Sequence, residues 1–150
     1  MDTNKFYTSN IPQLVASMNA PNLSEEDKVA TIKALNKLTE PNNTMVAGNI
    51  DTVVRSGIIP SLVNILQQQS TEINSELLLA VVWNFTNITA TEKVNCVAEA
   101  DGAVANLVQL LQHPEMNIQE ASALGIGNIA AHSKSYRMGL LNLDGFLSRL

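Results

Sequence analysis

Apolar residues follow a helical spacing along most of the chain, and one pattern of them returns. The segments 57–67 (GIIPSLVNILQ) and 102–112 (GAVANLVQLLQ) both open with glycine and then place Leu-Val and Leu at the same offsets. A weaker copy begins at Asn10, and a truncated copy, GFLSRL, begins at Gly145. The four starts are 47, 45 and 43 residues apart, a spacing typical of stacked repeat proteins.

Each full copy is followed by a longer helical pattern. The first covers residues 24–39, where Ser24 is a suitable N-cap and acidic residues fill the first turn. The second covers about 73–89 and the third about 117–132. The glycine that opens a copy is expected to end a preceding short helix in the left-handed conformation. No stretch alternates with period two, so we expect no strands.

The predicted unit is therefore a short helix, a glycine, a middle helix, a loop and a long helix. Three helices in about 40–47 residues is the size of an armadillo or HEAT repeat, and the glycine between the first two helices favours armadillo. Such units stack into a right-handed superhelix with a concave surface. We predict an all-α armadillo α-solenoid: one domain over 1–150, with repeats at roughly 10–44, 45–89 and 90–132 and a partial repeat at 133–150. The last residues should end partway through a middle helix and leave an apolar face open, as in a shortened chain or an end-to-end contact.

Composition narrows the possible functions. The chain is 45% hydrophobic and 4% aromatic, with a formal net charge of −5. This balance argues against a nucleic-acid-binding protein, which needs a basic face, and suits a cationic partner. No signal peptide and no apolar run of membrane-spanning length is present, so we expect no membrane partner. The single cysteine, Cys96, forms no internal disulfide and fits a reducing compartment. Its neighbours Val94 and Val97 predict a buried, inert thiol.

Catalytic and cofactor-binding arrangements are not found. The segment GIGNIA (125–130) matches a loose dinucleotide-loop pattern but lies inside a helical pattern, where its glycines indicate close approach between helices. His113 and His132 are expected in separate loops, and neither has a second ligand at metal-binding spacing. We therefore predict no enzyme, no cofactor and no metal site.

Two motifs in the long helices resemble those of a known family. WNFTNI (83–88), followed about forty residues later by LGIGNIA (124–130), resembles the third helices of importin-alpha, the nuclear-import adaptor, which carry a tryptophan and, four residues on, an asparagine. EADGAVANLVQLL and VVRSGIIPSLVNIL resemble the surroundings of those helices. The likeness covers nearly the whole chain and corresponds to the family's opening repeats, without its basic autoinhibitory segment.

The resemblance implies which residues bind a ligand. Trp83 and Asn87 fall on the family's tryptophan–asparagine pair, and Asn128 falls on the asparagine of the next repeat. Leu124 stands where the family has tryptophan, and His132 stands where it has an acidic residue. The implied function is binding of an extended lysine- or arginine-rich peptide, or a cargo protein with a nuclear localisation signal, for import between cytoplasm and nucleus. Importin-beta is an implied partner only if a longer form carries the basic segment.

Helical geometry supports a displayed face independently of the resemblance. At about 100° per residue, Trp83 and Asn87 are about 40° apart, and Glu76 and Glu72 lie within about 20° of Trp83. The opposite side carries a sufficient core stripe: Leu78, Val81, Phe85 and Ile88. Glu120 shares a face with Leu124 and Asn128 in the same way. Glu72 is better explained as a solvated residue at the helix start.

These residues have a plausible chemistry with a basic peptide. An asparagine amide both donates and accepts, so it can bond a peptide backbone. Tryptophan offers a wall and a cation–π contact, and the acids favour a basic partner. Lys33 and Lys37 occupy the same stripe in the first repeat, so that repeat is expected to lie outside a cationic site.

Other interpretations remain open at this point. The asparagines could instead bridge neighbouring repeats, and Trp83 could be a core residue. The alternative functions are an armadillo scaffold without basic specificity and a self-associating structural fragment.

Overall fold

The computed structural model describes residues 10–68 and 74–149 of the 150-residue chain. These residues form helices and no strand, as the sequence predicts. The α-helices are α2 (Ile11–Ser17), α3 (Glu25–Thr39), α4 (Val46–Arg55), α5 (Ile58–Gln67), α6 (Ser75–Thr89), α7 (Val94–Ala98), α8 (Ala103–Gln109), α9 (Met116–His132) and α10 (Lys134–Leu141). Two short 3₁₀ helices, η1 (Leu110–Gln112) and η2 (Leu147–Arg149), follow α8 and α10.

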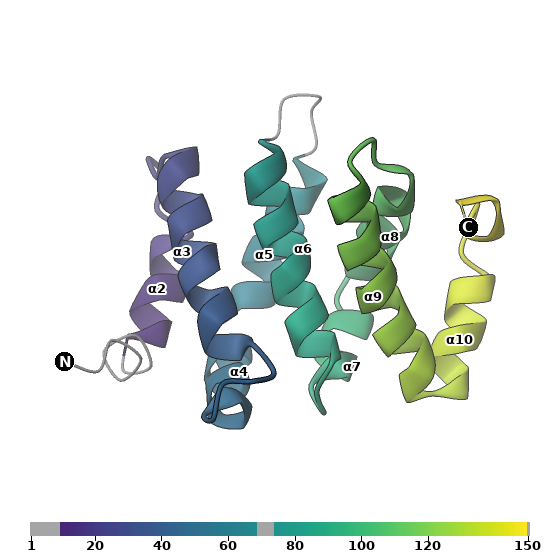
Figure 1. The fold of residues 1–150 in the computed structure, drawn as a ribbon, viewed down its shortest axis with the longest axis horizontal. Coiled ribbons are helices and arrows are strands. Elements are labelled where there is room, and N and C mark those ends of the chain that lie inside the picture. Colours follow the sequence, from purple (N-terminus) through teal and green to yellow (C-terminus); the bar gives the residue numbers. More distant parts are fainter. Residues whose placement is uncertain (1–9, 69–73, 150) are drawn as a thin grey trace.

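The helices form two layers. Figure 1 shows the long helices α3, α6 and α9 side by side, with the middle helices α2, α5 and α8 behind them. The short helices α4 and α7 lie near one end of the long helices. The predicted order of short, middle and long helix is seen in α4–α5–α6 and in α7–α8–α9. The all-α prediction is confirmed.

Local sequence explains where the helices begin and turn. Ser24 caps α3 by accepting a hydrogen bond from the backbone N–H of Asp27, as predicted. Gly57 and Gly102 follow α4 and α7 with φ of 87° and 82°. Because L residues with a side chain are strained there, glycine lets the chain turn directly from a short helix into a middle one.

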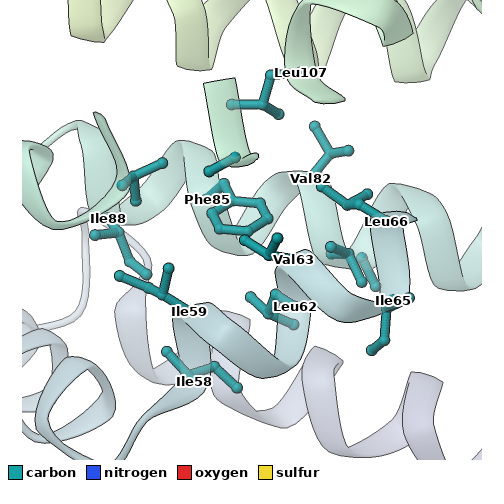
Figure 2. Packing of buried hydrophobic residues seen from close by; sticks show 14 of the residues in the cluster. Ile58, Ile59, Leu62, Val63, Ile65, Leu66, Val82, Phe85, Ile88 and Leu107 are labelled. Carbon is teal, nitrogen blue, oxygen red and sulfur yellow. The ribbon is translucent and has the colours of Figure 1, made fainter. Parts of the chain in front are cut away.

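The core lies between the two layers. The predicted apolar stripe of α6 is buried, and Phe85 within it has no exposed surface. Figure 2 shows the Phe85 ring among Leu62 and Val63 of α5 and Leu107 of α8. A long helix is therefore covered by the middle helix of its own unit and by that of the next unit, which is why one unit cannot bury its own apolar face.

The helices α6 and α9 approach closely at one point. The hydroxyl of Thr86 donates to the carbonyl oxygen of Ala121 at 2.9 Å. A Cβ added to Gly125 would lie 3.2 Å from the Thr86 Oγ1 atom. The close-approach interpretation of the GIGNIA glycines therefore holds for Gly125 but is wrong for Gly127, which has open space around it.

Three further expectations need correction or completion. Cys96 is half-buried rather than buried: it lies in the middle of the small helix α7 and packs against the outside of the core, whereas Val94 and Val97 are the buried residues of that helix. The segment expected to start a middle helix near the C-terminal end forms the single 3₁₀ turn η2. Apolar side chains of that end are exposed: Met138, Leu141 and Leu147. Within residues 10–68 and 74–149, no helix has the length and apolar character needed to span a membrane.

Replacing Gly102 with alanine is expected to destabilise the fold by about 1–2 kcal/mol. The backbone at this position has φ of 82°, and the new Cβ would lie 2.5 Å from the Gln67 Nε2 atom. Urea unfolding followed by circular dichroism measures the change. Gly48→Ala is the matched control, since Gly48 lies inside α4 with open space around it; it should stabilise by about 0.5–1 kcal/mol. Equal effects of the two variants would contradict this explanation.

Asp51 gives the fold a pH-dependent contact between α4 and the start of α7. The Lys93 Nζ atom lies 3.1 Å from one carboxylate oxygen and the Arg55 Nε atom lies 2.9 Å from the other. The hydrogen bond from Lys93, with the nearby positive charges, holds the pKa of Asp51 below its ordinary value of 3.8.

Because the folded pKa is depressed, the stability from Asp51 is present above its ordinary value and is lost as the pH falls through the folded value. Asp51→Asn should therefore lower the melting temperature near neutral pH, and the difference from the parent should vanish in acid. Asp101→Asn is the control, because Asp101 is exposed and forms no ion pair with a described residue. A difference that persists in acid would contradict the assignment.

Candidate functional site

Trp83 lies at the surface of the long-helix layer. Trp83 is 39% exposed, whereas Phe85, two positions further along α6, is completely buried. The interpretation of Trp83 as a core residue is therefore wrong. A large apolar ring at the surface is available for contact with a partner.

Asn87, one turn after Trp83, is only 8% exposed, because its amide bonds the preceding long helix. The Nδ2 atom donates to the backbone oxygen of Asn36 at 3.5 Å and to the hydroxyl of Thr39 at 3.2 Å. The amide nitrogen is thus bonded inside the protein. The Oδ1 atom accepts no hydrogen bond from a described residue and is not among the fully buried unpartnered atoms. The expectation that Asn87 has both a donor and an acceptor available is corrected: the nitrogen is bonded to α3, and only the oxygen is left without a partner among the described residues.

Asn128 of α9 repeats this arrangement one long helix further on. Its Nδ2 atom donates to the backbone oxygen of Thr86 at 3.4 Å and to the hydroxyl of Thr89 at 3.3 Å. The idea that the asparagines bridge neighbouring repeats is therefore right for their nitrogen atoms. The signal that could have revealed the acceptors is the spacing of polar residues in NKLT (36–39) and TNIT (86–89), each ending in a threonine.

Asn36 adds a second amide contact between α3 and α6. Its Nδ2 atom donates to the backbone oxygen of Ala80, and its Oδ1 atom accepts from the Nδ2 atom of Asn84, both at 2.9 Å. Asn84 is completely buried, and its own Oδ1 atom has no partner. These bonds fix the position of α6 along α3.

The bonds also define which positions correspond in successive long helices. Thr39 in α3 corresponds to Thr89 in α6, fifty positions further along the chain, because each hydroxyl accepts a hydrogen bond from an asparagine of the next long helix. By the same register, Lys33 and Lys37 hold in α3 the positions that Trp83 and Asn87 hold in α6. This pair of corresponding positions is therefore lysine and lysine in α3, and tryptophan and asparagine in α6.

A cleft of about 440 Å³ lies between α3 and α6. We call it the α3–α6 cleft; it is lined by Lys33, Asn36, Lys37, Glu40, Pro41, Trp83 and Asn87. The ammonium group of Lys33 forms an ion pair with the carboxylate of Glu76. The sequence indicated that Lys33 lies outside a cationic site, but it did not indicate that Lys33 forms an ion pair with the Glu76 carboxylate. Glu76 is therefore not a free carboxylate for a ligand.

The next step along the layer is formed by α6 and α9. Glu120 and Leu124 of α9 are exposed, Leu124 by 53%, and Asn128 is half-buried. Glu120 forms no ion pair with a described residue. His132 is exposed and is the last residue of α9 rather than a loop residue; its ring stacks on Tyr136 with centroids 5.6 Å apart.

Two further expectations concern Glu72 and a metal site. Glu72 lies outside the described residues. Among the residues that the structure describes, no group of three His, Cys, Asp or Glu side chains is arranged to hold a metal ion. The site is a surface that combines one aromatic ring, amide groups and charged side chains of both signs.

Sequence comparisons agree with this architecture. The Armadillo/beta-catenin-like repeat family model matches residues 47–89 and 100–131, half of the chain. Importin subunit alpha-8 of Arabidopsis thaliana is 35% identical over 94 residues, covering 63% of this chain and 20% of that protein. Importin subunit alpha-1b of Oryza sativa subsp. japonica is 29% identical over 89 residues, covering 59% of this chain and 16% of that protein. The chain thus matches about a fifth or less of the length of these relatives.

Solved structures share the fold. An engineered protein superposes on 93% of this chain and 54% of its own, with a TM-score of 0.76 and 23% identity. A designed armadillo repeat protein, solved in complex with the peptide (KR)4, covers 93% of this chain and 72% of its own, with a TM-score of 0.59 and 22% identity. Matched by the family model over half its length, the chain belongs to the armadillo-repeat family, and within that family it resembles importin subunit alpha.

Proposed function

We propose that this chain binds an extended, basic peptide of the nuclear-localisation type across α6 and α9, in protein import between cytoplasm and nucleus. The observation that carries the proposal is the exposed Trp83 together with two asparagines, Asn87 one turn along α6 and Asn128 at the corresponding position of α9. Asn87 and Asn128 are held in one register, and their Oδ1 atoms accept no hydrogen bond from described residues. The resemblance to importin subunit alpha supports the basic peptide.

Each contact has a simple physical role. The asparagine oxygens accept hydrogen bonds from backbone N–H groups of the peptide, which have no sheet partner of their own. Trp83 packs against the aliphatic stem of a lysine or arginine and attracts its charged end. Glu120 adds attraction for a basic side chain. Each such contact is worth about 1 kcal/mol, so useful affinity needs several together.

A second candidate is a scaffold for a peptide without basic character. It is favoured by Lys37, which lines the α3–α6 cleft and forms no ion pair with a described residue. Leu124 and His132 favour it too, because they stand where the resembled family carries tryptophan and an acid. A comparison of basic and neutral peptides separates the two candidates.

Titration of the (KR)4 peptide should change the emission of Trp83, the single tryptophan of the chain, in a saturable way that weakens with added salt. With a labelled peptide, Trp83→Ala should weaken binding about fivefold, the equivalent of about 1 kcal/mol. Met45→Ala is the matched control, since it removes an exposed apolar side chain at the start of α4, outside the proposed site. Equal or tighter binding of a neutral peptide of the same length would favour the scaffold instead.

The contribution of the Asn128 amide to stability and its contribution to peptide binding should be separable by mutation. Asn128→Ala removes both the bond to Thr89 and the acceptor offered to the peptide, so stability and affinity should both fall, stability by about 1 kcal/mol. Thr89→Val removes a buried hydroxyl and leaves Asn128 in place. It should lower stability by a similar amount and change the affinity less than about twofold.

Urea unfolding and peptide anisotropy measure these two quantities. A Thr89→Val variant that loses affinity as strongly as Asn128→Ala would contradict a direct peptide contact by the asparagine oxygen.

A further inference from the structure

We infer that Lys33 is a specificity-determining residue that occupies, from within the chain, the place of a ligand's basic side chain at Glu76. The inference rests on the proposed function, because it states which part of the surface of the long helices does not favour the basic side chains of a bound peptide. Its basis is the ion pair between the Lys33 ammonium group of α3 and the Glu76 carboxylate in the first turn of α6.

Glu76 is otherwise well placed to recognise a cation beside Trp83. The two residues are seven positions apart on α6, which is about 20° around the helix, so they share one face. The Glu76 side chain is 58% exposed and is therefore within reach of a ligand. Lys33 also lines the α3–α6 cleft next to Trp83, and its side chain is 54% exposed. A ligand ammonium that approached Glu76 along this face would have to compete with the ammonium group of Lys33 for the carboxylate.

The charges of the cleft do not restore an attraction for a basic residue. Lys37 stands one turn further along α3 and forms no ion pair with a described residue. Together with Glu40, the charged groups around the cleft are two positive and two negative. A peptide's basic side chains are thus not favoured at the step between α3 and α6.

The next step along the long helices differs in this respect. By the register of the asparagine bonds, the position of Lys33 is held in α6 by Trp83, which carries no charge. By the same register the position of Glu76 is held in α9 by Asn117. The carboxylate of α9 is Glu120, one turn before Leu124, and it forms no ion pair with a described residue. The basic residues of a bound peptide are therefore directed to Trp83 and the step between α6 and α9, away from the part of the α3–α6 cleft that Lys33 and Glu76 occupy.

The test is a set of four proteins titrated with labelled (KR)4 peptide at one ionic strength. Lys33→Gln should bind about threefold more tightly than the parent, because it frees the Glu76 carboxylate. Lys28→Gln is the matched control: it makes the same change in net charge on α3, at a residue that does not line the cleft. The double variant Lys33→Gln/Glu76→Gln should return to the affinity of the parent. Lys33 and Glu76 are both exposed, so circular dichroism should show all four proteins folded.

The outcomes separate the inference from the proposed function. A gain in Lys33→Gln that exceeds the gain in Lys28→Gln and needs Glu76 supports the inference. A parent that binds the peptide, with no extra gain in Lys33→Gln, overturns the inference and leaves the proposed function standing. A gain that persists in the double variant overturns it as well, since Lys33 would then act through general charge. Absence of binding by both the parent and Lys33→Gln overturns the proposed function and the inference together.

Discussion

The hydrogen bonds from an asparagine of one long helix to the preceding long helix set the arrangement on which the rest of the surface depends. Asn87 bonds Asn36 and Thr39, and Asn128 bonds Thr86 and Thr89, in the same geometry. These bonds use the amide nitrogen and leave the amide oxygen available. Because each long helix is fixed to its neighbour in one register, the side chains one turn away are also brought to equivalent places. The site is therefore a consequence of how the units stack.

Apolar packing supplies the driving force, and the polar contacts supply the register. Phe85 and its neighbours bury the inner face of α6 against α5 and α8, and such burial has no strong directional preference. A stack held by apolar contact alone could slide along the helix axes. The buried Thr86 hydroxyl on Ala121, and Gly125 opposite it, allow one close approach between α6 and α9. Buried polar groups left unpaired by such a slide would each cost about 1–3 kcal/mol.

The fold could be predicted from the sequence because its signals are local and repeated. The glycine between a short and a middle helix, the cap at Ser24 and the apolar stripe through Phe85 each follow from the chain within a few residues. The exposure of Trp83 agrees with the same stripe, because Trp83 lies on the side of α6 opposite Phe85; Asn87, on the side of Trp83, is nevertheless buried by the neighbouring helix. Contacts between units were harder. Lys33 and Glu76 are 43 positions apart, and nothing in either local sequence indicates that they meet. The direction of the asparagine amides likewise depends on the neighbouring helix, and so does the open space around Gly127.

The central claim is that a basic peptide lies along the layer of long helices, on the amide oxygens of Asn87 and Asn128 and the ring of Trp83. Nuclear magnetic resonance of the isotope-labelled chain, titrated with the (KR)4 peptide, tests it most directly. The account predicts that the largest shifts fall on the Trp83 indole N–H, the Asn87 and Asn128 side-chain amides and the backbone around Leu124. Shifts confined to the middle helices α5 and α8, or to the exposed apolar end around Leu141 and Leu147, would contradict it.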